Sequence, residues 1–183
     1  MNSDTVHYLN MFLGFGAILL QIFSVATLGI LFFGNKKHPI LNFLDKHFLI
    51  IGFIVSLFAM VFSLVYSEVI NFAPCYLCWW QRIFTYPLVL MFAIALWDKD
   101  KKVLRYSLPL LVVGFLFSIY QNLGYYFGEK GNTPCDSSGV SCYQQLVSEF
   151  HNYISIPMLA LTVFFALITL CLVVHFRQKN IAQ

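Results

Sequence analysis

The sequence has few charged residues. Only 10% of its 183 residues are Asp, Glu, Lys or Arg, whereas about a quarter of the residues in a soluble globular protein are charged. This shortage excludes an ordinary soluble domain. The net charge is only +3, and the basic residues form no stripe of the kind that binds nucleic acid, so we expect no nucleic-acid partner. Internal repeats and low-complexity segments are also absent.

Long uncharged runs take the place of the missing charges. A membrane-spanning helix needs about 20 mainly apolar residues, and hydrophobic residues make up 60% of this chain. We therefore predict an all-α integral membrane protein in contact with lipid. No Lys or Arg precedes the first run, which is longer than the roughly 7–15 apolar residues of a signal peptide, so we interpret it as a retained span. The predicted spans are residues 12–33, 48–66, 83–97 with a start near Cys78, 106–127 and 156–176.

The basic residues are distributed unevenly between the loops. Links 34–47 and 98–105 contain three and four Lys or Arg residues, whereas the N-terminal segment contains none and the loop 128–155 has only Lys130. Basic loops stay on the cytoplasmic side. We therefore predict an N-terminus outside and a C-terminus inside a bacterial inner (plasma) membrane. The cysteine pairs then face the oxidising extracytoplasmic side.

The first cysteine pair lies in the stretch Pro74-Cys75-Tyr76-Leu77-Cys78-Trp79-Trp80-Gln81-Arg82. If Cys78 opens a helix, Cys75 lies about one turn away, within the roughly 4.4–6.8 Å Cα separation of a disulfide. That helix start would direct its N–H groups at the Cys78 sulfur, and Arg82 would add a positive charge on the same face. Both effects favour the reactive thiolate. We predict a redox pair, with a structural disulfide and a headgroup-anchoring Arg82 as the alternatives.

The second pair, Cys135 and Cys142, lies in a polar loop. Gly139 and the neighbouring serines let the chain double back there, and an exposed disulfide would be open to attack. A zinc site built from all four outer cysteines is the alternative, but we expect no metal. Apolar residues then recur at helical spacing, which predicts a short interfacial amphipathic helix; these residues are Tyr143, Leu146, Val147, Phe150 and Ile154.

A set of motifs resembles the DsbB/BdbC family of membrane thiol:quinone oxidoreductases over about residues 48–174. The motifs are Ser67-Glu68, the Pro-Cys-x-x-Cys-x-x-Gln-Arg signature at 74–82, Tyr86-Pro87-Leu88, the proline-led Cys135 and Ile-Pro-x-Leu-x-Leu at 156–161. The resemblance implies a four-helix transmembrane bundle core, to which this chain adds one N-terminal helix. We expect three parts: residues 1–47 with that helix and a cytoplasmic link, the redox domain 48–176, and the tail 177–183.

The resemblance also implies roles for individual residues. Cys75 and Cys78 would be the quinone-linked pair, with Cys78 as the thiolate that contacts the quinone and Arg82 as the cation beside it. Cys135 and Cys142 would face the partner, a DsbA-like thioredoxin-fold donor that forms a mixed disulfide with Cys135. Electrons would run from the donor through the second pair and the first pair to ubiquinone or menaquinone. With only six residues between Cys135 and Cys142, the chain matches the short-loop BdbC-like branch, and the order of disulfide exchange stays open.

Other residues in the spans have two interpretations each. Trp79 and Trp80 are typical of an interface belt, or they contact the quinone. Gln121 and Asn122 are polar groups at membrane depth, which tend to face a bundle interior. Cys171 has no partner in sequence and is expected to be an inert packing residue.

Three functions compete at this point. The first is an enzyme that generates protein disulfides at the expense of a quinone. The second runs in reverse, as a conduit for thiol reductant or a vitamin-K-epoxide-reductase-like quinone reductase. The third is a disulfide-stapled membrane scaffold without catalytic activity, for which Arg82 would be dispensable and mild reductant would leave the disulfides intact.

Overall fold

Five long helices make up most of the part of the chain that the structure describes. In this computed structural model, that part comprises residues 3–34, 38–127, 141–142, 147 and 149–181. The helices are α1 (Ser3–Phe33), α2 (Pro39–Leu64), which continues into the π-helical turn η1 (Val65–Val69), α3 (Tyr76–Asp98), α4 (Val103–Phe127) and α5 (Ile156–Ile181). Each is long and apolar enough to cross a membrane. The predicted all-α membrane fold with five spans is confirmed.

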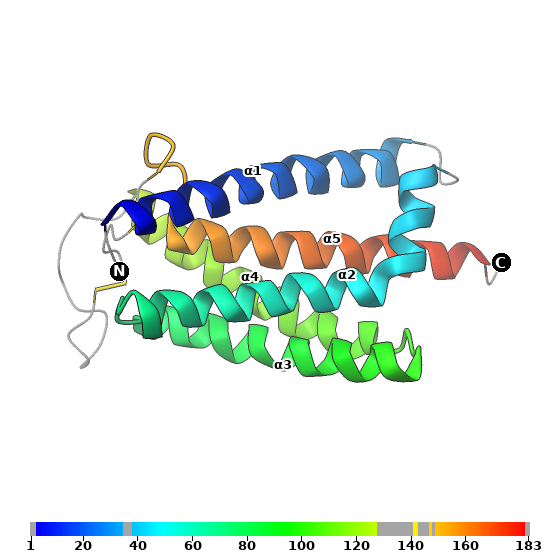
Figure 1. Ribbon diagram of the computed structural model, residues 1–183. Helices are drawn as coiled ribbons and strands as arrows, with labels where there is room; N and C mark the ends of the chain where they lie inside the picture. The colour runs from blue at the N-terminus through cyan, green and yellow to red at the C-terminus, as the bar shows by residue number, and fades with distance from the viewer. Residues whose placement is uncertain (1–2, 35–37, 128–140, 143–146, 148, 182–183) are drawn as a thin grey trace.

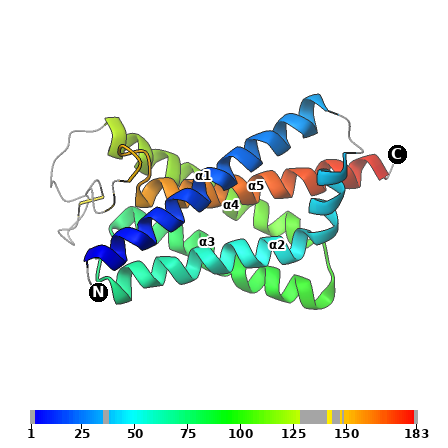
Figure 2. The same cartoon turned by 45° about the horizontal axis from the view of Figure 1, so that its top comes forward.

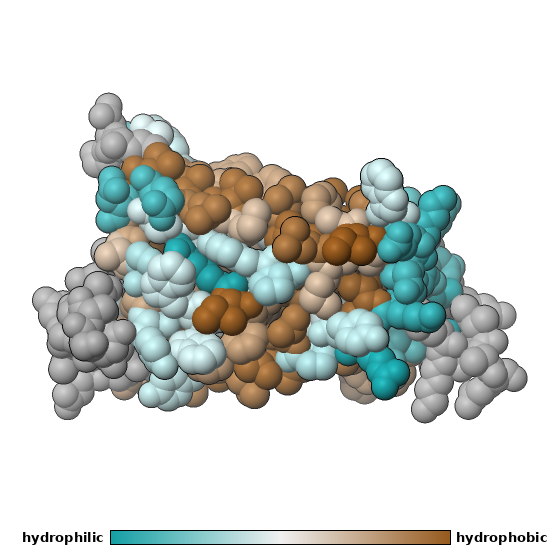
Figure 3. Space-filling model, turned by 90° about the horizontal axis from the view of Figure 1, so that it is seen from below, coloured by the Kyte–Doolittle hydropathy of each residue, from teal (hydrophilic) through white to brown (hydrophobic). Residues whose placement is uncertain are grey.

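The helices run alternately up and down along one long axis (Figure 1). α2, α3, α4 and α5 pack as a bundle, and α1 lies mainly on α5, with much less contact to α2. Figure 2 shows α1 crossing α5 obliquely, with its N-terminal end near the end of α2 that leads into η1. Apolar side chains dominate the middle of the face seen in Figure 3, and hydrophilic ones gather most densely at its right-hand end. The chain is a multi-pass membrane protein.

α2 begins earlier than we predicted. It starts at Pro39 rather than at residue 48, so Asp45 and Lys46 lie on the helix and not in a link. Proline suits a first helical turn, where its missing N–H is not needed. The side chain of His38 caps the helix by accepting a hydrogen bond from the Ile40 amide at 3.3 Å.

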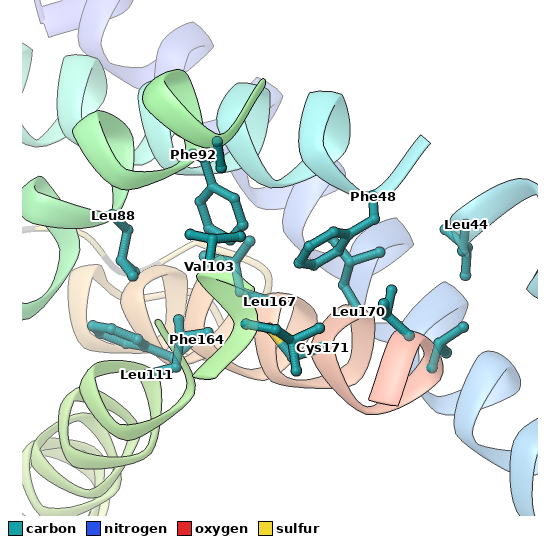
Figure 4. Packing of buried hydrophobic residues seen from close by; sticks show 14 of the residues in the cluster. Leu44, Phe48, Leu88, Phe92, Val103, Leu111, Phe164, Leu167, Leu170 and Cys171 are labelled. Carbon is teal, nitrogen blue, oxygen red and sulfur yellow. The ribbon is translucent and has the colours of Figure 1, made fainter. Parts of the chain in front are cut away.

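The bundle half that is distant from Cys75 has a tightly packed apolar core, shown in Figure 4. Phe48 of α2 and Phe92 of α3 meet edge to face, with ring centroids 5.7 Å apart. A Cβ atom added at Gly52 would lie 2.7 Å from the Phe92 ring. Such close approach is how small residues allow membrane helices to pack. Cys171 of α5 is fully buried in this core.

At the opposite end, η1 and a short turn lead the chain into α3. The wide π-helical turn places Tyr66 inside the protein, where its hydroxyl donates a hydrogen bond to Asn10 of α1 at 2.6 Å. Asn71 then adopts a left-handed backbone with φ of 63°, a conformation that asparagine tolerates better than most residues. The chain turns back here toward Cys75.

The predicted amphipathic helix at 143–154 is wrong in its described part. Residues 143–146 and 148 lie outside the description. Glu149 and Ile154 instead close a tight reverse turn through two backbone hydrogen bonds of 3.1 Å. The turn contains three successive left-handed residues, Phe150, His151 and Asn152, with φ of 51°, 58° and 64°.

Contacts with the helices explain why this segment is a turn. The Phe150 ring packs directly on α1, because a Cβ atom added at Gly14 would lie 2.8 Å from it. The Tyr126 hydroxyl donates to the Tyr153 carbonyl at 2.6 Å, and the Tyr153 hydroxyl donates to Gln21 of α1 at 2.8 Å. Phe150 of the apolar pattern and its neighbour Tyr153 instead fasten the turn onto α1 and α4.

Candidate redox site

The start of α3 differs from our prediction by two residues, and the difference changes which sulfur is capped. The helix begins at Tyr76, and Cys75 with its extended backbone is the N-cap. The Cys78 amide therefore donates a hydrogen bond to the Cys75 sulfur at 3.4 Å. We had expected the first-turn N–H groups to point at Cys78. A capping side chain precedes the helix and folds back over its first turn, and Cys75 occupies that position.

Three of the four cysteines of the two predicted pairs meet at this helix start. The Cys75 and Cys78 sulfurs are 3.0 Å apart, and Cys75, Leu77 and Cys142 pack together in one buried cluster. Cys75 and Cys142 are each only 4% exposed. The neighbouring thiols of Cys142 and Cys78, followed by burial, raise the pKa of Cys75 above its usual value. Cys135 lies outside the described residues.

Gln121 of α4 connects the three sulfur-bearing residues. Its side-chain nitrogen lies 3.4 Å from the Cys75 sulfur, 3.5 Å from the Cys78 sulfur and 3.3 Å from the Cys142 carbonyl oxygen. Its side-chain oxygen accepts a hydrogen bond from Gln81 of α3 at 2.7 Å. Gln121 is 1% exposed. A polar group at membrane depth was the only sequence signal for this residue, and it could not show which groups Gln121 contacts.

Arg82 is held across the interface between α3 and α2. Its Nε donates to the Ser63 hydroxyl at 2.9 Å and its Nη2 to the Ser63 carbonyl at 2.8 Å. The guanidinium carbon also lies 5.3 Å from the centre of the Trp79 ring, within the range of a cation–π contact. Arg82 and Cys78, which we predicted to lie on the same helix face, both line one cavity.

This cavity has a volume of about 500 Å³, which is in the range of small-molecule sites. Cys75, Cys78, Arg82 and Gln121 line one end, and apolar side chains of α1, α2 and α5 line most of the remainder. A quinone has a polar ring that accepts electrons and an apolar tail. The residues therefore fit such a group, with the ring at the sulfur end.

The two tryptophans of the signature do not line the cavity. Trp79 is 54% exposed, and Trp80 stacks on Phe117 with ring centroids 5.3 Å apart. These positions agree with the interface-belt interpretation rather than with quinone contacts. Asn122 is buried and donates to the Pro157 carbonyl at 2.9 Å, where it joins α4 to α5.

Comparisons with known proteins agree with this geometry. The family described as "Disulfide bond formation protein DsbB" matches residues 45–175. The chain is 43% identical to disulfide bond formation protein C of Bacillus subtilis over 122 residues, 66% of this chain and 87% of that protein. It is 37% identical to probable disulfide formation protein C 2 of Bacillus anthracis over 141 residues, 76% of this chain and 99% of that protein. No solved structure matches the chain.

The matched region contains α3, α4 and most of α2 and α5, and it leaves out α1. It therefore covers the sulfur cluster, Arg82 and most of the cavity wall. The sulfur cluster, the apolar cavity beside it and the family match lead to one conclusion. The chain belongs to the DsbB family of disulfide bond formation proteins, which are membrane thiol:quinone oxidoreductases.

Proposed function

We propose that this protein reoxidises an extracytoplasmic DsbA-like dithiol donor and passes the electrons through Cys142, Cys75 and Cys78 to a membrane quinone. The observation that carries the proposal is the packing of Cys142 with Cys75 in one buried cluster, next to Cys78 at the cavity wall. In the net reaction, the donor loses two electrons and two protons and gains a disulfide. The quinone, when bound, accepts those electrons and protons and becomes a quinol.

The exchange begins at the second pair. A donor thiolate attacks Cys135 in the Cys135–Cys142 disulfide, forms a mixed disulfide and releases Cys142 as a thiolate. The second donor thiol displaces Cys135, which leaves the donor oxidised.

The next exchange moves the electrons inward. The Cys142 thiolate attacks the Cys75 sulfur of the Cys75–Cys78 disulfide. The Cys75–Cys142 bond forms, the Cys75–Cys78 bond breaks, and Cys78 leaves as a thiolate at the cavity wall. Cys135 then attacks Cys142, which re-forms the second disulfide and releases Cys75. The contact between Cys75 and Cys142 supports this order over direct attack on Cys78.

Two polar side chains support the chemistry at the cavity. The Gln121 amide hydrogen-bonds to the sulfurs and so stabilises negative charge on Cys78 as it leaves. Arg82, braced by Ser63, provides a fixed positive charge where negative charge develops during quinone reduction. Donors and charges that are already in position lower a barrier more than groups that must reorganise.

The charge distribution supports an extracytoplasmic sulfur cluster. Lys101 and Asp45 form an ion pair of 2.8 Å at the end of the bundle that holds the α3–α4 link. Arg177 lies at this same end, 3.8 Å from Asp45, and the sulfur cluster lies at the other. Because basic residues favour the cytoplasmic side, Cys75 and Cys142 would face outward, where a secreted thioredoxin-fold donor can reach the loop.

The experiment that tests this proposal is quinone reduction in detergent, driven by a reduced thioredoxin-fold donor and followed by the loss of quinone absorbance. We expect turnover by the unmodified protein, none by Cys78→Ser, and a weaker quinone affinity for Arg82→Ala. No turnover with ubiquinone or menaquinone and several donors would overturn the oxidase. Reduction of an oxidised donor by added quinol, without the forward reaction, would support the reverse conduit instead.

A further inference from the structure

α1 lies outside the part of the chain that matches the family, yet it forms part of the cavity wall. The match begins at residue 45, whereas α1 ends at Phe33. The α1 residues on the wall are spaced so that they share one face of a helix; they are Phe12, Leu13, Gly16, Ala17 and Leu20. One side of the cavity between α2, α3, α4 and α5 is therefore formed by α1.

Hydrogen bonds fasten α1 across two helices of the bundle. Asn10 accepts a buried hydrogen bond from Tyr66 at the end of α2, at 2.6 Å. One and a half turns past the Gly16 level, Gln21 donates to the Thr162 hydroxyl of α5 at 2.7 Å. Side-chain hydrogen bonds between membrane helices stabilise their association. With one such bond on each side of Gly16, this part of α1 is held in place as a wall of the cavity.

The cavity extends from the sulfurs along the apolar helices. Its wall along α2 and η1 runs from Ile54 to Tyr66, a rise of about 18 Å at 1.5 Å per residue. Phe12 of α1 and Phe58 of α2 both line the cavity, and the two residues are 67% and 54% exposed. The cavity thus reaches the lipid-facing surface along the seam between α1 and α2, where the two helices have little contact.

Gly16 lies in the middle of the α1 wall and leaves it open. A Cβ atom added there would meet no other atom within 4 Å. Because Gly16 lines the cavity, a larger side chain at this position would enter the cavity or its opening at the seam. The missing side chain makes room for an apolar chain beside α1.

We propose that α1 forms one wall of a channel for the isoprenoid tail of the quinone, with the tail lying across Gly16 toward the seam between α1 and α2. This inference rests on the proposed function, because it takes the quinone ring to bind at the Cys78 and Arg82 end of the same cavity. A long, apolar passage that joins this end to the lipid suits a hydrocarbon tail that enters sideways from the membrane. α1 is then a specificity element that the four-helix unit lacks.

The test compares Gly16→Leu with Gly29→Leu. Gly29 lies on the same helix, a Cβ added there also meets no atom within 4 Å, and it does not line the cavity. Binding is titrated in detergent through quenching of tryptophan fluorescence, with an isoprenoid quinone and with a benzoquinone that carries only methyl groups. KM values for both quinones and for the thiol donor are measured in parallel.

We expect Gly16→Leu to weaken binding of the isoprenoid quinone roughly fivefold to tenfold, about 1 kcal/mol or slightly more. Its binding of the methylated benzoquinone and its KM for the donor should stay within about twofold of the unmodified protein, and Gly29→Leu should match that protein for every ligand. Gly16→Ala, which adds one methyl group, should give a smaller change in the same direction. It also keeps the test available if leucine prevents folding.

Equal loss of affinity for both quinones would overturn the proposal, because the new side chain would then act on the ring site. No loss for either quinone would overturn it as well. Both results leave the proposed function intact as long as the unmodified protein reduces quinone. If the unmodified protein neither binds nor reduces any quinone, the proposed function itself fails.

Discussion

The two ends of this bundle each bury cysteine, and they treat it in opposite ways. The two ends are named outer and inner for the orientation that we propose. At the outer end, Cys75 and Cys78 touch one another, a buried glutamine and a cavity. At the inner end, Cys171 lies among tightly packed apolar side chains of the core that includes Phe48 and Phe92. Burial is shared by both ends. A second sulfur within reach, the amide of a buried glutamine and a cavity wall distinguish the outer end.

The two ends also differ in how they are packed. Buried polar groups need hydrogen-bond partners, so the outer end contains a connected set of hydrogen bonds, and it leaves space for a ligand. The inner end has glycines that bring aromatic rings close to a neighbouring helix, as at Gly52 and Phe92. Close packing tolerates little change in volume. We therefore expect substitutions to affect activity at the outer end and stability at the inner end.

The largest difference in effect should come from replacing one cysteine at each end. Cys78→Ser should abolish turnover, because a serine hydroxyl cannot take part in thiol–disulfide exchange. Cys171→Ala should leave turnover of the folded protein within about twofold and lower its stability by roughly 1 kcal/mol, since a small buried group is lost. Quinone absorbance and thermal unfolding measure the two quantities. Comparable loss of turnover in both variants would contradict the contrast.

A disulfide-trapping experiment sharpens the description of the outer end. Cys78→Ser/Cys135→Ser leaves Cys75 and Cys142 as the reactive outer cysteines, and their contact should let mild oxidant join them almost completely. The matched control Cys75→Ser/Cys135→Ser retains Cys78 with Cys142 and should cross-link much less. Peptide mapping of the oxidised proteins identifies the bond. Preferential cross-linking in the control would reverse the proposed order of exchange.

The buried glutamine pair allows rate and stability to be separated. Gln121→Leu removes the hydrogen bonds to the sulfurs and should slow turnover about tenfold to a hundredfold, near the lower limit for a lost preorganised donor. It also leaves Gln81 without its partner, which should cost about 1–3 kcal/mol. The double variant Gln81→Leu/Gln121→Leu should recover stability but not rate. If its rate recovers too, Gln121 acts only through the fold.

Arg82 tests the cavity side of the outer end. Arg82→Lys should raise the KM for quinone by about tenfold while the KM for the donor stays unchanged, because lysine cannot reproduce the paired contacts with Ser63. Ser63→Ala removes only the hydroxyl partner and should give a smaller rise in the same constant. A change in the KM for the donor instead would place Arg82 in partner binding.

The smallest effect on activity is expected at the inner end. Gly52→Ala brings a methyl group against the Phe92 ring and should lower stability by about 1–3 kcal/mol through overpacking. Turnover per folded molecule should not change. Gly29→Ala, on an open face of α1, is the control and should be neutral or slightly stabilising. Thermal unfolding in detergent compares the two, and equal unfolding temperatures would contradict the packing difference.

Sequence patterns predicted the features that depend on neighbours along the chain. Five uncharged runs predicted five helices, and the spacing of Cys75 and Cys78 predicted two sulfurs one helical turn apart; the structure confirms both. The start of α2 at Pro39 was missed because charged residues such as Asp45 were counted as a link. The turn at 149–154 was missed because helical spacing does not reveal that Phe150 packs on α1.

By itself, the sequence determined the membrane-spanning fold, the proximity of Cys75 and Cys78, and the family, because these depend on hydropathy, spacing and short motifs. Only the tertiary structure decided that Gln121 reaches the sulfurs, that Cys142 meets Cys75, and that α1 closes one side of the cavity. These contacts join residues far apart in the chain. They depend on how whole helices pack, because packing decides which of several polar or apolar faces are in contact. A local sequence pattern does not show which faces these are.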